Sequence, residues 1–292
     1  MSKLTISTIL ILSSLMSFAQ GWHYLGETPP GTTPKEFAPH ILKKEGRVEF
    51  GSTFSKDGTE FFYSIQSEGF ADILYMKYDG KEWSKPKVIF ESPSYGLNDP
   101  MLTPDEQKLF FISQMPNKKD DDTQDHDIYY ANRTKDGWSE PINIGSPISL
   151  PDVSEYYIAF TAEGHMYFSS ERDARYQRDF NIYRSELKNG KYQEPEMLPS
   201  DINTGNYEAD VYVAPDESYI IFASSRRSGY GQVDLFISQK TADGEWGKSR
   251  NLGEIINTPG PEYCPFVSHD GKYLFYTSNQ DLYWVSMDAV LK

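Results

Sequence analysis

The stretch Ser268-His269-Asp270-Gly271-Lys272-Tyr273-Leu274-Phe275-Tyr276-Thr277-Ser278 decides the fold of this chain. An Asp-Gly pair supplies the positive φ that a tight turn needs, and aromatic residues favour strands. With Glu262–Val267 before it, the stretch therefore predicts a strand, a turn and a second, aromatic strand. The pattern recurs about every fifty residues, a period typical of propellers and other repeat arrays. Its five copies centre on Asp57, Asp105, Glu163, Asp216 and Asp270.

Each copy contains signals for a third and a fourth strand. The third strand begins with an acidic or amide residue: Asp72, Asp127, Asn181, Asp234 and Asp281. An Asp-Gly or Asn-Gly turn follows in the first four copies, then an aromatic residue (Trp83, Trp138, Tyr192 and Trp246), and then Pro86, Pro141, Pro195 or, as an exception, Ser249. A proline is tolerated on an outer edge strand, where its missing N–H has no neighbour. Four antiparallel strands with a blunted outer edge form one blade of a β-propeller, and we expect the aromatic column to pack between blades.

The fifth copy lacks the signals for a fourth strand and ends after Trp284-Val285-Ser286-Met287. The N-terminal run Glu36-Phe37-Ala38-Pro39 resembles the missing strand, with Pro39 in the proline position. We therefore predict an all-β fold, a single β-propeller of five four-stranded blades whose ring is closed by residues 36–42. Closure removes an open sheet edge on which chains could aggregate. A six-bladed ring is the alternative, although no sixth unit is found.

The N-terminus has the pattern of a secretory signal peptide. Lys3 is followed by an apolar segment from Leu4 to Met16, and Ser17-Phe18-Ala19 places small residues before Gln20. We predict a signal peptide over 1–19 that is cleaved near Ala19-Gln20, an N-terminal extension over 20–35 and the propeller over 36–292. The protein should thus be exported, to the periplasm or the extracellular space, and no later apolar run approaches the length of a membrane span.

The formal net charge of −15 argues against nucleic acid as a partner and favours cations or a basic protein. Cys264 is the only cysteine, so no internal disulfide can form. Its place in a strand indicates a small buried residue rather than a nucleophile. We expect a monomer.

The repeats resemble the Pro-Asp-type, WD-repeat-like propeller repeats of the TolB family over nearly the whole mature chain. The resemblance rests on the turn of each unit: Ser55-Lys56-Asp57-Gly58, Thr103-Pro104-Asp105-Glu106, Thr161-Ala162-Glu163-Gly164, Ala214-Pro215-Asp216-Glu217 and Ser268-His269-Asp270-Gly271. It implies a propeller. TolB itself has an additional N-terminal domain for which we expect no room here, so a role in the Tol envelope system does not carry over.

Acidic residues form a first candidate site. Glu49, Glu155, Glu208 and Glu262 open the first strand of four copies, and Asp99 lies near the gap in the second copy. Since these strands begin beside the axis, the carboxylates should approach its mouth. They could serve the blades structurally, bind a cation, or act as acid and base in glycoside cleavage. The structural interpretation is favoured, because a repeated residue has repeated, equivalent surroundings.

Two further groups lie in the long connections between second and third strands. The acidic residues Asp120, Asp122 and Asp125 could hold calcium, although a solvated acidic loop explains them as well. No other cofactor is expected. Arg172 and Arg175, with Arg227 after Ser224-Ser225, could bind a carboxylate or sulfate ligand, or could pair with the glutamates.

Two classes of function follow. The favoured one is an exported, non-enzymatic propeller that binds a protein or an envelope component through the face bearing the long loops, near 113–126 and 169–180. The alternative is a carbohydrate-active enzyme or glycan-binding protein. It predicts carboxylates in a deep axial pocket, with pKa values pushed apart.

Overall fold

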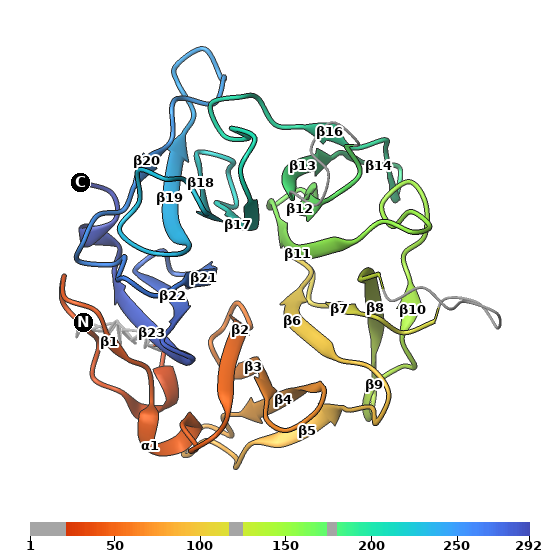
Figure 1. Ribbon diagram of the computed structural model, residues 1–292. Helices are drawn as coiled ribbons and strands as arrows, with labels where there is room; N and C mark the ends of the chain where they lie inside the picture. Colours follow the sequence, from red (N-terminus) through yellow and green to blue (C-terminus); the bar gives the residue numbers. More distant parts are fainter. Residues whose placement is uncertain (1–21, 117–124, 174–179) are drawn as a thin grey trace, which may run out of the picture.

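Five small antiparallel sheets surround a central axis in the computed structural model (Figure 1), which describes residues 22–116, 125–173 and 180–292. The first blade consists of β2 (Val48–Phe54), β3 (Glu60–Gln66), β4 (Ala71–Lys77) and β5 (Lys87–Phe90). The second consists of β6 (Leu97–Leu102), β7 (Lys108–Ser113), β8 (Asp127–Thr134) and β10 (Ile142–Asn143), with β9 (Gly137–Trp138) paired to the end of β8. The predicted five-bladed, all-β propeller is confirmed.

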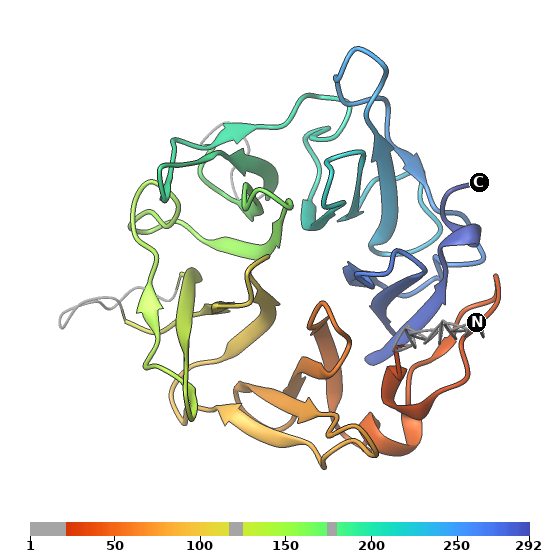
Figure 2. The same cartoon turned by 180° about the vertical axis from the view of Figure 1, so that it is seen from behind.

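The other blades repeat this order. The third consists of β11 (Glu155–Phe160), β12 (Met166–Ser170), β13 (Asn181–Ser185) and β16 (Glu196–Met197), beside a small hairpin of β14 (Leu187–Lys188) and β15 (Lys191–Tyr192). The fourth consists of β17 (Glu208–Val213), β18 (Tyr219–Ser224), β19 (Asp234–Gln239) and β20 (Arg250–Asn251). The fifth consists of β21 (Glu262–Val267), β22 (Tyr273–Ser278), β23 (Asp281–Ser286) and the N-terminal β1 (Lys35–Glu36). In both views of the ring, the N-terminal strand lies beside the last blade (Figure 2).

The N-terminus closes the ring as expected, but the predicted register is wrong. Lys35 lies opposite Trp284 of β23, just as Lys87 lies opposite the equivalent Tyr75 in the first blade. Because Lys87 follows Pro86, the proline position of the fifth blade is held by Pro34 and not by Pro39.

Residues 36–42 are therefore not one edge strand. The strand ends at Glu36, Ala38 adopts a left-handed conformation with φ +45°, and Pro39 begins the short helix α1 (Pro39–Leu42). Proline suits the first turn of a helix, where its missing N–H would have no partner. The Phe37 N–H still bonds to Leu282 O at 2.7 Å, and the Phe37 side chain is buried against the last blade.

The core lies in the seams, the interfaces between neighbouring blades. Second strands are buried on both faces, as their continuous apolar runs indicate; Phe61, Phe62 and Tyr63 of β3 are inaccessible to solvent. Burying one such side chain contributes about 1.5–3 kcal/mol. The largest apolar cluster joins blades four, five and one to the N-terminal segment around Tyr24 and Phe37.

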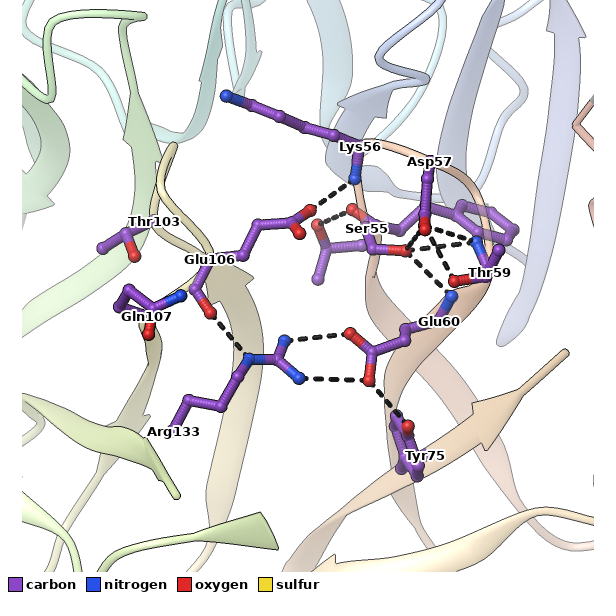
Figure 3. Close-up of polar contacts among 12 residues, drawn as sticks. Ser55, Lys56, Asp57, Thr59, Glu60, Tyr75, Thr103, Glu106, Gln107 and Arg133 are labelled. Carbon is purple, nitrogen blue, oxygen red and sulfur yellow. Dashed lines mark hydrogen bonds and ion pairs between the residues drawn. The ribbon is translucent and has the colours of Figure 1, made fainter. Parts of the chain in front are cut away.

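The repeated turns are fixed by their own side chains. Asp57 Oδ1 accepts hydrogen bonds from Ser55 Oγ at 2.7 Å, from the Thr59 N–H at 3.0 Å and from Thr59 Oγ1 at 2.8 Å (Figure 3). The turns between first and second strands form one face of the ring, which we call the turn face. The connections between second and third strands form the opposite face, which we call the loop face. In the described part of the chain, no helix is long and apolar enough to cross a membrane.

Every inner strand has an irregularity at the same position. One residue in each has a positive φ, between +44° and +53°, and the pairing register shifts beside it. These residues are Gly51, Asp99, Tyr157, Asp210 and Cys264. Non-glycine residues in this conformation cost about 1–2 kcal/mol each and cluster at functional sites. A β-bulge also changes the direction of the side chains beside it and is common next to active sites. The axis of the propeller is therefore the place to look for a functional site.

Candidate ligand site at the propeller axis

The repeated glutamates connect the blades. The backbone N–H of each donates to the preceding blade: Glu49 to Gln280 O, Glu155 to His126 O, Glu208 to Phe180 O and Glu262 to Val233 O, at 2.6–3.0 Å. Their carboxylates are buried. Three of them accept a hydrogen bond from the serine that ends the second strand of the same blade: Ser170, Ser224 and Ser278. The geometry is the one expected of residues that serve the blades.

Arginines complete these contacts. Arg172 Nη2 lies 3.2 Å from Glu155 Oε1, Arg226 Nε lies 3.2 Å from Glu208 Oε1, and Arg47 Nε lies 2.5 Å from Glu49 Oε1. Glu262 instead accepts from the hydroxyl and the N–H of Thr258, at 2.7 and 2.9 Å.

The arginine equivalent to Arg172 is thus Arg226, although the two Ser-Ser pairs, Ser169-Ser170 and Ser224-Ser225, had suggested Arg227. Arg227 is exposed. Arg175 lies outside the described residues, as do Asp120 and Asp122. Asp125 is described, and no group of three or more metal-ligating side chains occurs among the residues with a defined position.

A cavity of about 320 Å³ lies among the inner strands, near the ends of these strands that point toward the loop face. We call it the axial pocket. Asp99, Asp210 and Cys264, three of the five residues with positive φ, line it. Apolar and aromatic side chains form the rest of its lining: Phe50, Tyr156, Tyr207, Val233 and Tyr263. The bulges therefore bring together residues from the second, fourth and fifth blades.

Cys264 joins the two carboxyl groups. Its Sγ lies 3.3 Å from Asp99 Oδ1 and 3.9 Å from Asp210 Oδ2, and its backbone N–H donates to Asp210 Oδ2 at 3.2 Å. The Asp99 N–H donates to Ser64 Oγ at 2.9 Å. Gly51 makes room for Asp99, because a Cβ on Gly51 would lie 2.2 Å from Asp99 Oδ1.

The two carboxyl groups are each only 5% exposed, and no cationic side chain in the described ranges pairs with either. Burial raises the pKa of Asp99 to about 8, with the nearby charge of Asp210 adding to it, and burial raises the pKa of Asp210 to about 6. At neutral pH the pair therefore retains a proton, mainly on Asp99. Burial also raises the pKa of Cys264 well above its usual value, so its thiol is no nucleophile.

A row of rings borders the pocket on one side. His126 lies 4.5 Å from Tyr156, Tyr156 lies 5.5 Å from Phe180, and Phe180 lies 5.8 Å from Tyr207, measured between ring centroids. Burial lowers the pKa of His126 to about 4, so the ring is neutral at physiological pH. The two acids are thus surrounded by aromatic rings, and His126 adds no positive charge to these surroundings.

Sequence reasoning found Asp99 but missed Asp210, Cys264 and the tyrosines. One signal was present: Asp210 and Cys264 each stand two residues after a repeated glutamate, and Asp99 stands two after Leu97. The residue type at this position differs among the five copies, whereas the turn and the aromatic strand around it recur. Variation of this kind is a better indicator of a site than the repeated glutamate itself.

No protein-family model matches the sequence, and no curated protein matches it either. Solved propeller structures do. A thermostable family-43 glycoside hydrolase matches with a TM-score of 0.54 at 13% identity, over 84% of this chain and 90% of that one. Hydrazine synthase of Kuenenia stuttgartiensis gives 0.53 at 14% identity, over 81% of this chain but only 37% of that one. A structure assigned to TolB from Agrobacterium tumefaciens gives 0.48 at 16% identity, over 79% and 69%. At these identities the likeness extends to the β-propeller fold alone.

Proposed function

We propose that this chain is an exported, non-enzymatic propeller that binds a protein or envelope component at its loop face, with the axial pocket receiving an organic cation of that partner. One observation supports this most: Asp99 and Asp210 are buried without a cationic partner among the described residues, and they line an aromatic-walled cavity. Burying a carboxylate is costly unless it is paired. A ligand that supplies the missing positive charge would remove that cost.

The walls of the pocket fit the same ligand. The face of an aromatic ring attracts a cation within about 6 Å of its centroid, and cages of such rings recognise substituted ammonium groups. Tyr156, Tyr207 and Tyr263 supply three rings, while the two carboxyl groups supply hydrogen-bond acceptors. A lysine side chain has both a thin apolar stem and an ammonium group. The net charge of −15 would help to attract a basic partner over longer distances.

Export is part of the proposal and rests on residues 1–19. A positive residue, an apolar segment and small residues before Gln20 support cleavage of this segment during secretion.

A pair of small probes tests the cation site. Nα-acetyl-lysine amide should bind the mature protein in a saturable manner by NMR titration, whereas the uncharged analogue Nα-acetyl-norleucine amide should bind at least tenfold more weakly. The double variant Asp99→Asn and Asp210→Asn keeps the shape and removes both acids, so it should weaken lysine-amide binding at least tenfold. Asp243→Asn, in an exposed hairpin turn, is the matched control and should bind as the unaltered protein does. Equal binding of both probes, or none, would contradict the proposal.

Glycoside cleavage is the second candidate. It is favoured by the different pKa values of Asp99, about 8, and Asp210, about 6, because one carboxyl group could donate a proton while the other is ionised. Against it, few polar groups besides these acids and the tyrosine hydroxyls line the pocket. Turnover of any member of a panel of aryl glycosides, lost in Asp99→Asn, would establish this alternative; a panel without turnover would leave binding.

A further inference from the structure

The seams between blades reach the turn face, and the chain closes four of them in different ways. Between blades one and two, Arg133 forms a double ion pair with Glu60, Nη1 to Oε1 at 3.1 Å and Nη2 to Oε2 at 2.9 Å (Figure 3). Tyr75 donates to the same carboxylate at 2.7 Å, and Arg133 lies over the ring of Trp138. This seam is filled by a charged pair and a tryptophan.

Three other seams are closed by different groups. Between blades three and four, Glu217 accepts from Arg184, Lys240 and Tyr167 at 2.8–3.1 Å. Between blades four and five, the short C-terminal turn Met287–Ala289 packs its buried Met287, while Arg250 donates to Val290 O.

Between blades five and one, the N-terminal segment fills the seam. Tyr24 Oη donates to Asp270 Oδ2 at 2.8 Å, and the Tyr24 ring lies 5.1 Å from Tyr273 and 6.2 Å from Phe275. His23 stacks on Tyr78 at 4.2 Å. The Trp22 ring covers Gly58, where a Cβ would lie 2.7 Å from the indole. Trp22 to Tyr24 thus act as an inserted aromatic peptide.

Among the described residues, no ion pair or inserted segment fills the seam between blades two and three at the turn face. It holds a cavity of about 400 Å³, and a second cavity of about 310 Å³ shares its Lys108, Phe110, Gly190 and Tyr192. The ion pair of the first seam is missing, because Lys108 stands in the place of Glu60 and Leu187 in the place of Arg133. Tyr192 also stands where the neighbouring seams have a tryptophan.

The repeat makes this open seam the counterpart of the one that the N-terminus fills. Counting from the turns, five residues that contact Trp22, His23 or Tyr24 have a counterpart at the same repeat position in this seam. Asp270, Tyr273, Phe275, Gly58 and Tyr78 correspond to Asp105, Lys108, Phe110, Gly164 and Leu187. All five of the latter residues line the larger cavity.

We propose that the seam between blades two and three binds a short segment of a partner protein that carries aromatic side chains next to a carboxylate. The requirement for aromatic side chains comes from the seam between blades five and one, where Trp22 and Tyr24 occupy the corresponding positions. The acidic requirement comes from Lys56, Lys108 and Lys191, which line the two cavities and outnumber the carboxylates of Asp105 and Glu163 in the same lining. Asp105 corresponds to the acceptor of the Tyr24 hydroxyl and offers the same bond to a tyrosine. This site is on the turn face and is independent of the axial pocket.

A peptide taken from the chain itself provides the probe. Residues 21–27, Gly-Trp-His-Tyr-Leu-Gly-Glu, contain the aromatic residues and a carboxylate. The fluorescently labelled, acetylated peptide should bind the mature protein saturably by anisotropy. The same peptide with Trp22→Ala and Tyr24→Ala should bind at least tenfold more weakly.

A variant that closes the seam tests the location. Lys108→Glu together with Leu187→Arg introduces the ion pair of the first seam, and it should weaken peptide binding at least tenfold without lowering the melting temperature. A photo-crosslinking peptide with benzophenone in place of Tyr24 gives a second readout on the unaltered protein, and its crosslinks should map to 103–110 and 187–192. Absence of saturable binding, unchanged affinity in the double variant, or crosslinks confined to the seam between blades five and one would overturn the proposal.

Discussion

Asp99 and Asp210 place two acids in surroundings that disfavour their charge, and this has a consequence for stability. The folded-state pKa of Asp99 is about 8, against an ordinary value of 3.8. Between these pH values the folded protein binds more protons than the unfolded chain, so the contribution of Asp99 to stability falls as pH rises from about 4 to about 8. Asp210 adds to the same trend up to about pH 6.

Asp99→Asn should therefore stabilise the protein at pH 8 by several kcal/mol, up to about 6 kcal/mol, and have little effect at pH 4. The pKa of Asp99 rises from 3.8 to about 8 on folding, and one pKa unit corresponds to about 1.4 kcal/mol. Urea unfolding at the two pH values measures this. Asp243→Asn, exposed in a turn, should leave the free energy of unfolding unchanged at both. A destabilised Asp99→Asn variant at pH 8 would mean that the carboxylate is held ionised by contacts other than those described.

Gly51 is a second residue on which the pocket depends. Its φ is +50°, and an added Cβ would collide with Asp99 Oδ1. Gly51→Ala should lower the free energy of unfolding by about 3 kcal/mol, because the alanine is strained in a left-handed conformation and its Cβ overpacks the site. Gly80→Ala separates the two terms, because Gly80 also has a positive φ but no atom of the described residues lies within 4 Å of an added Cβ. It should cost about 1 kcal/mol. Equal costs by urea unfolding would show that Asp99 is not constrained by Gly51.

At the scale of the elements, the N-terminal segment joins its sheet through two residues, and Phe37 is one of the buried side chains that join it to the core. Phe37 is buried against Phe54, Phe61, Phe275 and Trp284, with ring centroids 4.9–6.1 Å away. Phe37→Ala should destabilise the domain by about 3–5 kcal/mol. Phe70→Ala, at an exposed position, should change stability by less than about 0.5 kcal/mol. A melting temperature for Phe37→Ala equal to that of Phe70→Ala would contradict the role of this segment.

The elements also show what sequence can reveal. Repetition made the blades and the closed ring predictable, because the same turn and aromatic strand occur five times. The register of β1 was mistaken because Pro34 and Pro39 are both near the expected position, and only pairing with Trp284 selects Pro34. Asp210 was overlooked because a β-bulge changes which side chain lines the axis, and simple alternation along a strand does not reveal a bulge.

At the scale of the whole molecule, the ring is closed by both ends of the chain. The N-terminal β1 covers the edge strand β23 of the last blade, which would otherwise be free. Removing residues 20–42 deletes β1, α1 and the aromatic insertion between blades five and one. Such a chain should lose the single cooperative thermal transition of the domain, whereas a chain that starts at Gln20 should keep it. Two chains with equal thermal transitions, measured by circular dichroism, would show that the propeller closes without its N-terminus.

Three observations make cation binding at the axis the central claim: the net charge of −15, two buried acids without a cationic partner among the described residues, and the aromatic walls. Its most direct test is a crystal structure of the mature protein with saturating Nα-acetyl-lysine amide. The ammonium nitrogen should lie in the axial pocket within about 2.7–3.2 Å of a carboxylate oxygen of Asp99 or Asp210, with its stem beside the tyrosine rings. A pocket that remains without ligand at saturation, or a ligand bound only at another surface, would contradict the claim.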